Sequence, residues 1–150
     1  MDQLSEHFTL KEACYSSTAL RLGIDNKAPD FIIPSLQAVA LHILEPVRAH
    51  FGKFTPSSWY RCHALNRAIG SKDSSQHIQG EAVDFEIPGT DNLELSYWCI
   101  ENLQFDQLIL EYYEENDPSS GWVHCSYSKN FRAHILTIWK GGSVTVGLPA

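Results

Sequence analysis

The stretch SSQHIQGEAVDFEI, residues 74–87, joins a polar loop to a segment in which apolar side chains alternate with others. Successive side chains of a strand point to opposite sides, so the apolar residues of this segment would share one face and Asp84 would lie on the other. His77 precedes the strand, and Gly80 between the two residues permits a sharp turn of the backbone. We therefore expect a β-strand with a carboxylate turned away from the core and a histidine near it.

A second strand pattern, WVHCSY at residues 122–127, places His124 on the face opposite its aliphatic residues. If the two strands are neighbours, Asp84 and His124 would converge, and the preceding loop could bring His77 to them. Two imidazoles and one carboxylate leave the fourth position of a tetrahedral zinc ion open, as in catalytic zinc sites. The alternative is a loop histidine, an aspartate that holds a turn and a core histidine without any metal.

Helical patterns dominate the first half of the chain and recur once in the second. They cover residues 8–16, 17–23, 34–52, 62–70 and 92–103. Thr9 followed by Glu12 is a capping-box pattern, which predicts the start of the first helix. Pro46 lies inside the longest pattern, where a proline is expected to kink or break the helix.

Strand patterns are concentrated in the second half. They cover residues 54–61, 82–87, 105–113, 122–127 and 133–139. We expect the last two to pair with each other through the connection 128–132. This order of elements predicts an α+β fold with residues 1–150 as a single domain, a helix-rich N-terminal half and a mostly antiparallel sheet in the C-terminal half.

Composition and charge are those of an ordinary globular protein. The 150 residues are 43% hydrophobic and 19% charged, with a net charge of −7. Because phosphate recognition needs clustered Lys and Arg, we expect no nucleic-acid binding. No apolar run approaches the about 20 residues that cross a bilayer, and no Sec-type signal peptide is visible, so we expect synthesis in the cytoplasm and no membrane insertion. The four cysteines form no Cys-x-x-Cys pair and are expected to be reduced thiols.

The pattern Ser-x-His-x-x-Gly-x-Ala-x-Asp at residues 75–84, followed by WVH at 122–124, resembles the zinc D-Ala-D-Ala carboxypeptidase family. That family shares its fold with the Hedgehog signalling domain and includes phage endolysins. The segments FTLKEACYSSTALRLGIDN, SSWYRCHALNRAIGS and FDQLILE are also similar to its short single-domain branch, so the resemblance covers nearly the whole chain. It implies a Hedgehog-like fold with a Zn²⁺ ion bound by His77, Asp84 and His124.

The resemblance also implies a substrate-binding group. Arg61 matches the family arginine that holds the substrate, a role suited to a guanidinium because its fork of donors fits a carboxylate. Ser75 and Gln76 would line the same pocket as hydrogen-bonding groups. An ordinary surface arginine is the plain alternative for Arg61.

The chain departs from the family where several members have an acid three residues before the last histidine ligand. This acid acts as general base, and Gly121 stands here in its place. Glu111, at the end of the strand FDQLILE, is the best substitute, because strand alternation puts it opposite the leucines and it resembles a glutamate of this branch. A solvated strand-end acid is the alternative. The weaker candidates are Glu86, Glu114 and Glu115. Trp59 stands where the family often has glycine, which would narrow the cleft.

The implied activity is hydrolysis of a peptide bond in bacterial peptidoglycan by a monomeric zinc peptidase. D-Ala-D-Ala carboxypeptidase, D,D-endopeptidase and L-alanyl-D-glutamate endopeptidase activities all remain open. We expect action on the cell wall after release through a separately encoded pore, as in a phage lysin, or as a virion component. The competing expectation is a zinc-containing binding or structural module with little or no hydrolysis.

Overall fold

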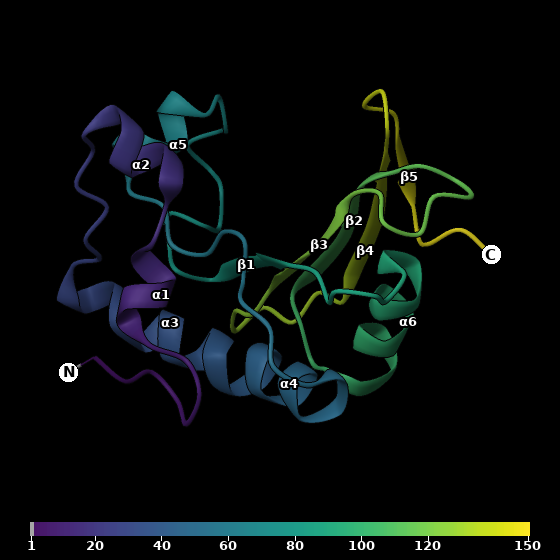
Figure 1. Cartoon of the computed structure of the whole chain (residues 1–150), viewed down its shortest axis with the longest axis horizontal. Helices are drawn as coiled ribbons and strands as arrows, with labels where there is room; N and C mark the ends of the chain where they lie inside the picture. The colour runs from purple at the N-terminus through teal and green to yellow at the C-terminus, as the bar shows by residue number, and fades with distance from the viewer. Residues whose placement is uncertain (1) are drawn as a thin grey trace.

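Within residues 2–150, which the computed structural model describes, five strands form one mixed sheet (Figure 1). The sheet has the order β1-β3-β2-β4-β5. The strand bounds are Ala82–Phe85 for β1, Gln107–Tyr113 for β2, Trp122–Ser126 for β3, His134–Trp139 for β4 and Val144–Val146 for β5. Three of the neighbouring pairs are antiparallel, and β2 pairs with β4 in parallel. The α+β fold is confirmed, but the prediction of a mostly antiparallel sheet is wrong.

The predicted pairing of the last two strand segments is also wrong. β3 lies between β1 and β2, so both of its edges are already paired and β4 joins the free edge of β2. A short connection returns the chain from the end of β3, so β4 runs opposite to β3 and therefore parallel to β2. The short edge strand β5 was not predicted.

Helices fill the first half of the chain, as predicted. Their bounds are Leu10–Cys14 for α1, Ser17–Leu22 for α2, Ile33–Val39 for α3, Glu45–Phe51 for α4, His63–Ala68 for α5 and Asn92–Asn102 for α6. The capping box of Thr9 and Glu12 is present at α1. Segment 54–61, in contrast, is no strand. It makes one isolated antiparallel bridge, between Ser58 and Asp84.

The longest helical stretch, Asp30–Phe51, continues through Pro46 without a break. A π-helical turn at Ala40–Leu44 precedes the proline, and the amide of Glu45 donates to the carbonyl of Ala40. Because proline lacks an N–H and its ring crowds the preceding turn, this wider turn accommodates it. The helix is thus not broken at Pro46, and the local irregularity beside the proline is this π-helical turn.

The stretch Asp30–Phe51 is long and apolar enough to cross a membrane by length and composition alone. The core helix of a soluble protein has the same properties, and here Leu36, Val39 and Ile43 are fully buried. They pack in one cluster with side chains from the inner face of the sheet, including Phe85. The other face of β1 and β3 carries the polar side chains of Asp84, His124 and Ser126.

Candidate metal centre

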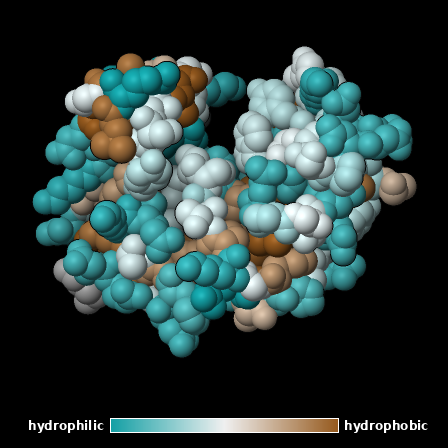
Figure 2. All heavy atoms as spheres, in the orientation of Figure 1, coloured by the Kyte–Doolittle hydropathy of each residue, from teal (hydrophilic) through white to brown (hydrophobic). Residues whose placement is uncertain are grey.

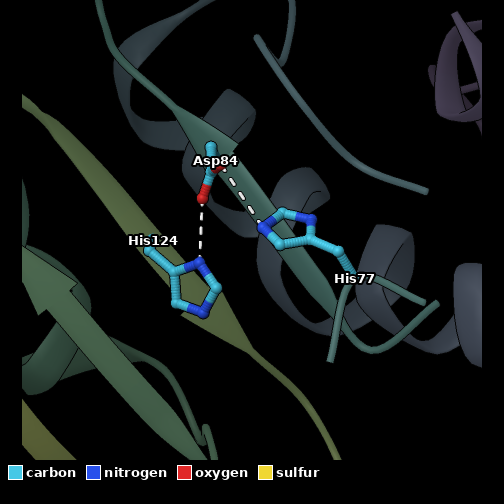
Figure 3. Close-up of side chains that lie close together, drawn as sticks. All are labelled: His77, Asp84 and His124. Carbon is cyan, nitrogen blue, oxygen red and sulfur yellow. Dashed lines mark hydrogen bonds and ion pairs between the residues drawn. The ribbon is translucent and has the colours of Figure 1, made fainter. Parts of the chain in front are cut away.

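β1 and β3 are neighbours, and Asp84 is paired directly with His124. Directly opposed residues of an antiparallel pair project from the same face, so the two side chains meet. Nδ1 of His124 lies 2.9 Å from Oδ1 of Asp84, and Nε2 of His77 lies 3.3 Å from Oδ2 of the same carboxylate (Figure 3). One candidate ligand atom from each residue lies within 4.8 Å of the others. The structure thus brings together the three residues predicted as ligands.

The imidazole of His77 is oriented by a backbone carbonyl. Its Nδ1 lies 2.6 Å from the oxygen of Trp59. Because a carbonyl can only accept, Nδ1 carries a proton, and Nε2 is the ring nitrogen that faces Asp84. A hydrogen bond from the second ring nitrogen of a histidine is the usual support of a metal ligand. A backbone carbonyl has no sequence signature, so this contact could not be predicted.

Gly80 gives the loop its required turn. Its φ is +72°, and a Cβ at this position would lie 2.7 Å from a side-chain carbon of Ile32. The glycine therefore serves two needs, a left-handed backbone and close packing of the loop against the helical layer. This confirms the predicted turn between His77 and Asp84.

All three candidate ligands are buried, and their charges are coupled. Burial lowers the pKa of His77 below its usual value, which favours the neutral imidazole that a metal requires. Burial alone would raise the pKa of Asp84, but the two imidazoles hold it well below its usual range, so the carboxylate stays ionised. Burial also opposes protonation of His124, yet the Asp84 carboxylate raises its pKa. A cation at this point would take the place of that proton.

Arg61 lies beside this group. Its backbone N–H donates to the carbonyl of His77 over 3.2 Å, and its Nε is buried without a hydrogen-bond partner among residues 2–150. Burial lowers the pKa of Arg61, and the negative charges of Asp84 and Glu111 oppose this effect. A guanidinium remains charged under such conditions, so an unpaired donor here is available to an anionic or carbonyl group.

A pocket of about 160 Å³ adjoins Arg61 and is rich in hydroxyl groups. Its polar lining includes Ser16, Thr18, Ser57, Ser58 and Tyr60. In Figure 2 the surface is hollowed between the part formed by α2 and α5 and the tip of the sheet. The arginine therefore lies where a polar ligand can reach it.

Ser75 and Gln76 do not turn toward the three candidate ligands. The hydroxyl of Ser75 accepts from the backbone N–H of His77 over 3.2 Å. The amide of Gln76 donates to Asp106 over 2.9 Å and to Glu81 over 3.3 Å. Both side chains are engaged in holding the loop, and their role as substrate-binding groups stays a prediction.

Glu111 shares the face that carries His124. It is paired with Trp122, which projects from β3 on the same side as His124. The register of β2 shifts between Glu111 and Tyr113, and Tyr112 has a φ of 53°, so a bulge lies next to the glutamate. Burial first, and the charge of Asp84 second, raise the pKa of Glu111. A half-buried carboxylate of raised pKa is a stronger base than an exposed one, which favours a role in accepting a proton.

The other acids are placed differently. Glu86 accepts from the amide of Asn92, Glu114 forms an exposed ion pair with Lys140, and Glu115 is exposed. Trp59 is 1% exposed and packs edge-on against Phe8 in the core. The expectation that the side chain of Trp59 narrows the cleft is therefore wrong. Trp59 contributes to the site through its backbone carbonyl, which orients His77.

Gly121 has no room for any side chain. Its φ is +67°, and a Cβ would lie 2.0 Å from the carbonyl oxygen of Glu111 and 2.9 Å from the carbonyl carbon of Tyr112. The bulge of β2 occupies the space that an acid at position 121 would need. The bulge of β2 thus has two effects: it excludes an acid at position 121, and it lies next to Glu111.

We expect Gly121→Ala to destabilise the fold by about 2 kcal/mol or more, because strain at positive φ adds to a contact with the backbone of β2. Urea unfolding followed by circular dichroism measures the change. Gly23→Ala is the matched control, since Gly23 has a φ of +68° and a Cβ added there would meet nothing within 4 Å. Equal losses in the two variants would show that the contact with β2 costs nothing.

A buried His–Asp–His group with an arginine and a glutamate beside it has the composition of a mononuclear metal-dependent hydrolase site. Residues 6–126 match the family described as Peptidase M15, and the chain belongs to this family. None of the curated proteins compared with it matches the sequence. M15 peptidases are zinc-dependent, and the buried group could bind such an ion.

Proposed function

We propose that the chain, acting as one domain over residues 1–150, is a zinc peptidase that hydrolyses a peptide bond in the stem or cross-link peptides of bacterial peptidoglycan. The observation that carries the proposal is the meeting of His77, Asp84 and His124 in a member of the peptidase M15 family. We also propose that the chain adopts the Hedgehog-like fold.

Each side chain has a defined part in this reaction. His77, Asp84 and His124 would hold the zinc ion, which would supply a Lewis acid for the substrate carbonyl and would lower the pKa of an attacking water molecule. Arg61 binds the substrate through its fork of N–H donors, at a carbonyl or carboxylate oxygen. The carboxylate of Glu111 accepts a proton from the attacking water and delivers it to the leaving amine.

Replacement of Arg61 tests the substrate-binding role. We expect Arg61→Ala to impair hydrolysis while zinc content is unchanged, because the guanidinium contacts substrate and not the metal. Arg61→Lys should restore only part of the activity, since an ammonium group is a point charge and cannot form the paired hydrogen bonds of a guanidinium. Initial rates on purified peptidoglycan and zinc analysis of both variants are the measurements. Parental rates in both would exclude Arg61 from substrate binding.

The activity itself is tested on purified sacculi. Products separated by liquid chromatography and identified by mass distinguish the bonds: release of D-Ala indicates a carboxypeptidase, loss of cross-linked dimers a D,D-endopeptidase, and a new N-terminal D-Glu an L-alanyl-D-glutamate endopeptidase. Protein that holds zinc but releases none of these products would contradict the proposal.

That last result would favour the second candidate, a zinc-containing module of the same family with weak or no catalysis. The observation on its side is Gly121, since no acid can occupy this position against the backbone of β2. Under the main proposal the protein acts as a monomer on the cell wall, after release from the cytoplasm or from a virion, without nucleic-acid partners or insertion into a membrane.

A further inference from the structure

The loop that carries His77, residues 69–81, connects α5 to β1 and contains no helix or strand. Its internal hydrogen bonds are short-range: the amide of His77 donates to Ser75, and the amide of Gly80 donates to the carbonyl of His77. Such bonds fix the shape of a loop. They do not fix where the loop lies relative to β1 and β3, which carry the other two ligands.

Contacts from outside the loop hold it on two sides. On one side, residues 59–61 bond to His77 itself, through the carbonyl of Trp59 and the amide of Arg61. Toward the sheet, Gln76 donates to Oδ2 of Asp106, the residue immediately before β2, over 2.9 Å. Gln76 is the neighbour of His77 in sequence, so this hydrogen bond ties the backbone next to the ligand to the sheet.

Asp106 is a firm attachment point. Its side chain is 1% exposed, and it accepts from Nε, Nη2 and the backbone N–H of Arg132 over 2.8, 3.0 and 3.1 Å. These hydrogen bonds hold the pKa of Asp106 below its usual value against the effect of burial. A buried carboxylate with a paired guanidinium has one preferred position, because leaving it is costly.

The amide of Gln76 is not needed to compensate this charge, since Arg132 already supplies three donors. The chain also accepts unusual backbone geometry to place Arg132, because Phe131 and Ala133 on either side of it have φ values of 43° and 51°. Left-handed residues other than glycine persist where surrounding contacts impose them. The contact of Gln76 with Asp106 therefore serves the loop and not the ion pair.

Asp106 does not belong to the group of candidate ligands. Its backbone N–H donates to the carbonyl of Ser126, at the far end of β3 from Trp122. We propose that Asp106 is a positioning residue for the metal centre: through Gln76 it holds the loop so that Nε2 of His77 stays within reach of Asp84 and His124. This inference rests on the proposed metal site but not on the hydrolysis of any substrate.

The test is the affinity of the purified full chain for zinc, measured by competition with a chromophoric chelator, together with the visible absorption of the cobalt(II)-substituted protein. Gln76→Ala removes the link and leaves the pair of Asp106 and Arg132 intact. We expect about tenfold weaker zinc binding, the low end for the loss of a supporting contact around a metal ligand, and an altered cobalt spectrum. The unfolding midpoint of the metal-free protein should stay near that of the parent.

Asp106→Asn should weaken zinc binding in the same way, and the double variant should bind no more weakly than the more affected single variant, because both act through one link. Asp73→Asn is the control. Asp73 lies in the same loop and forms an exposed ion pair with Arg67 of α5, so this variant should leave zinc affinity unchanged. Parental zinc affinity and cobalt spectrum in Gln76→Ala would overturn the proposal, even if Asp106→Asn fails to fold.

The same variants separate this inference from the proposed function. If Gln76 instead contacts substrate, Gln76→Ala raises KM and leaves metal affinity unchanged, which contradicts the positioning role. If the parent binds zinc but digests no peptidoglycan, the proposed peptidase activity fails while the metal measurements still decide the role of Asp106.

Discussion

Protein purified without added metal is expected to contain about one zinc ion per chain, and His77→Ala and His124→Ala to contain far less. Each variant leaves two protein ligands, and zinc sites in proteins are formed by at least three. Elemental analysis of the purified proteins is the measurement. The zinc-loaded parent should also be more stable than either variant, by about 4 kcal/mol when free zinc is 1,000 times the dissociation constant.

His63→Ala is the matched control for this experiment, since His63 is an exposed histidine at the start of α5. Its zinc content should equal that of the parent. Undiminished zinc in both His77→Ala and His124→Ala would remove the assignment of the metal centre, and with it the proposed chemistry.

Glu111→Gln is expected to lower the rate of peptidoglycan hydrolysis by on the order of 100-fold or more, the usual scale for the loss of a general acid–base group. The amide keeps the size and hydrogen bonding of the carboxyl but cannot accept the proton of an attacking water. Zinc content and unfolding midpoint should match the parent, because Glu111 is not among the candidate ligands. Initial rates at saturating substrate, compared at equal zinc loading, measure the effect.

Glu114→Gln is the control, because Glu114 is exposed and paired with Lys140 outside the site. Its rate should be parental. A near-parental rate in Glu111→Gln, combined with a large loss in Glu86→Gln or Glu114→Gln, would move the general base to that residue.

Much of the candidate site follows from strand alternation alone. The alternation at residues 82–87 and 122–127 puts Asp84 and His124 on the polar faces of their strands, and the structure confirms both placements. Which strands pair, and in which direction, is not contained in a period of two. That is why the parallel pairing of β2 with β4 and the place of β3 between two partners were not predicted.

Other features depend on contacts between distant backbone atoms. The carbonyl of Trp59 that orients His77 has no residue preference. The lack of space for a side chain at Gly121, beside the carbonyl of Glu111, could not be predicted from the sequence either. The one indication in the sequence was a glycine at a position where the family commonly has an acid. Asp106 directly precedes the strand at residues 107–113, and nothing in the sequence indicates that its carboxylate is buried.

β1 is an edge strand of four residues, and this has a consequence for how metal enters and leaves. His77 and Asp84 are close in sequence. His124 is 40 positions from Asp84 and contacts it only when β1 and β3 are paired. An unfolded or half-open chain therefore offers an incomplete chelate. A bound ion would hold β1 and β3 together, and we expect its residence time to depend on how often these two strands separate.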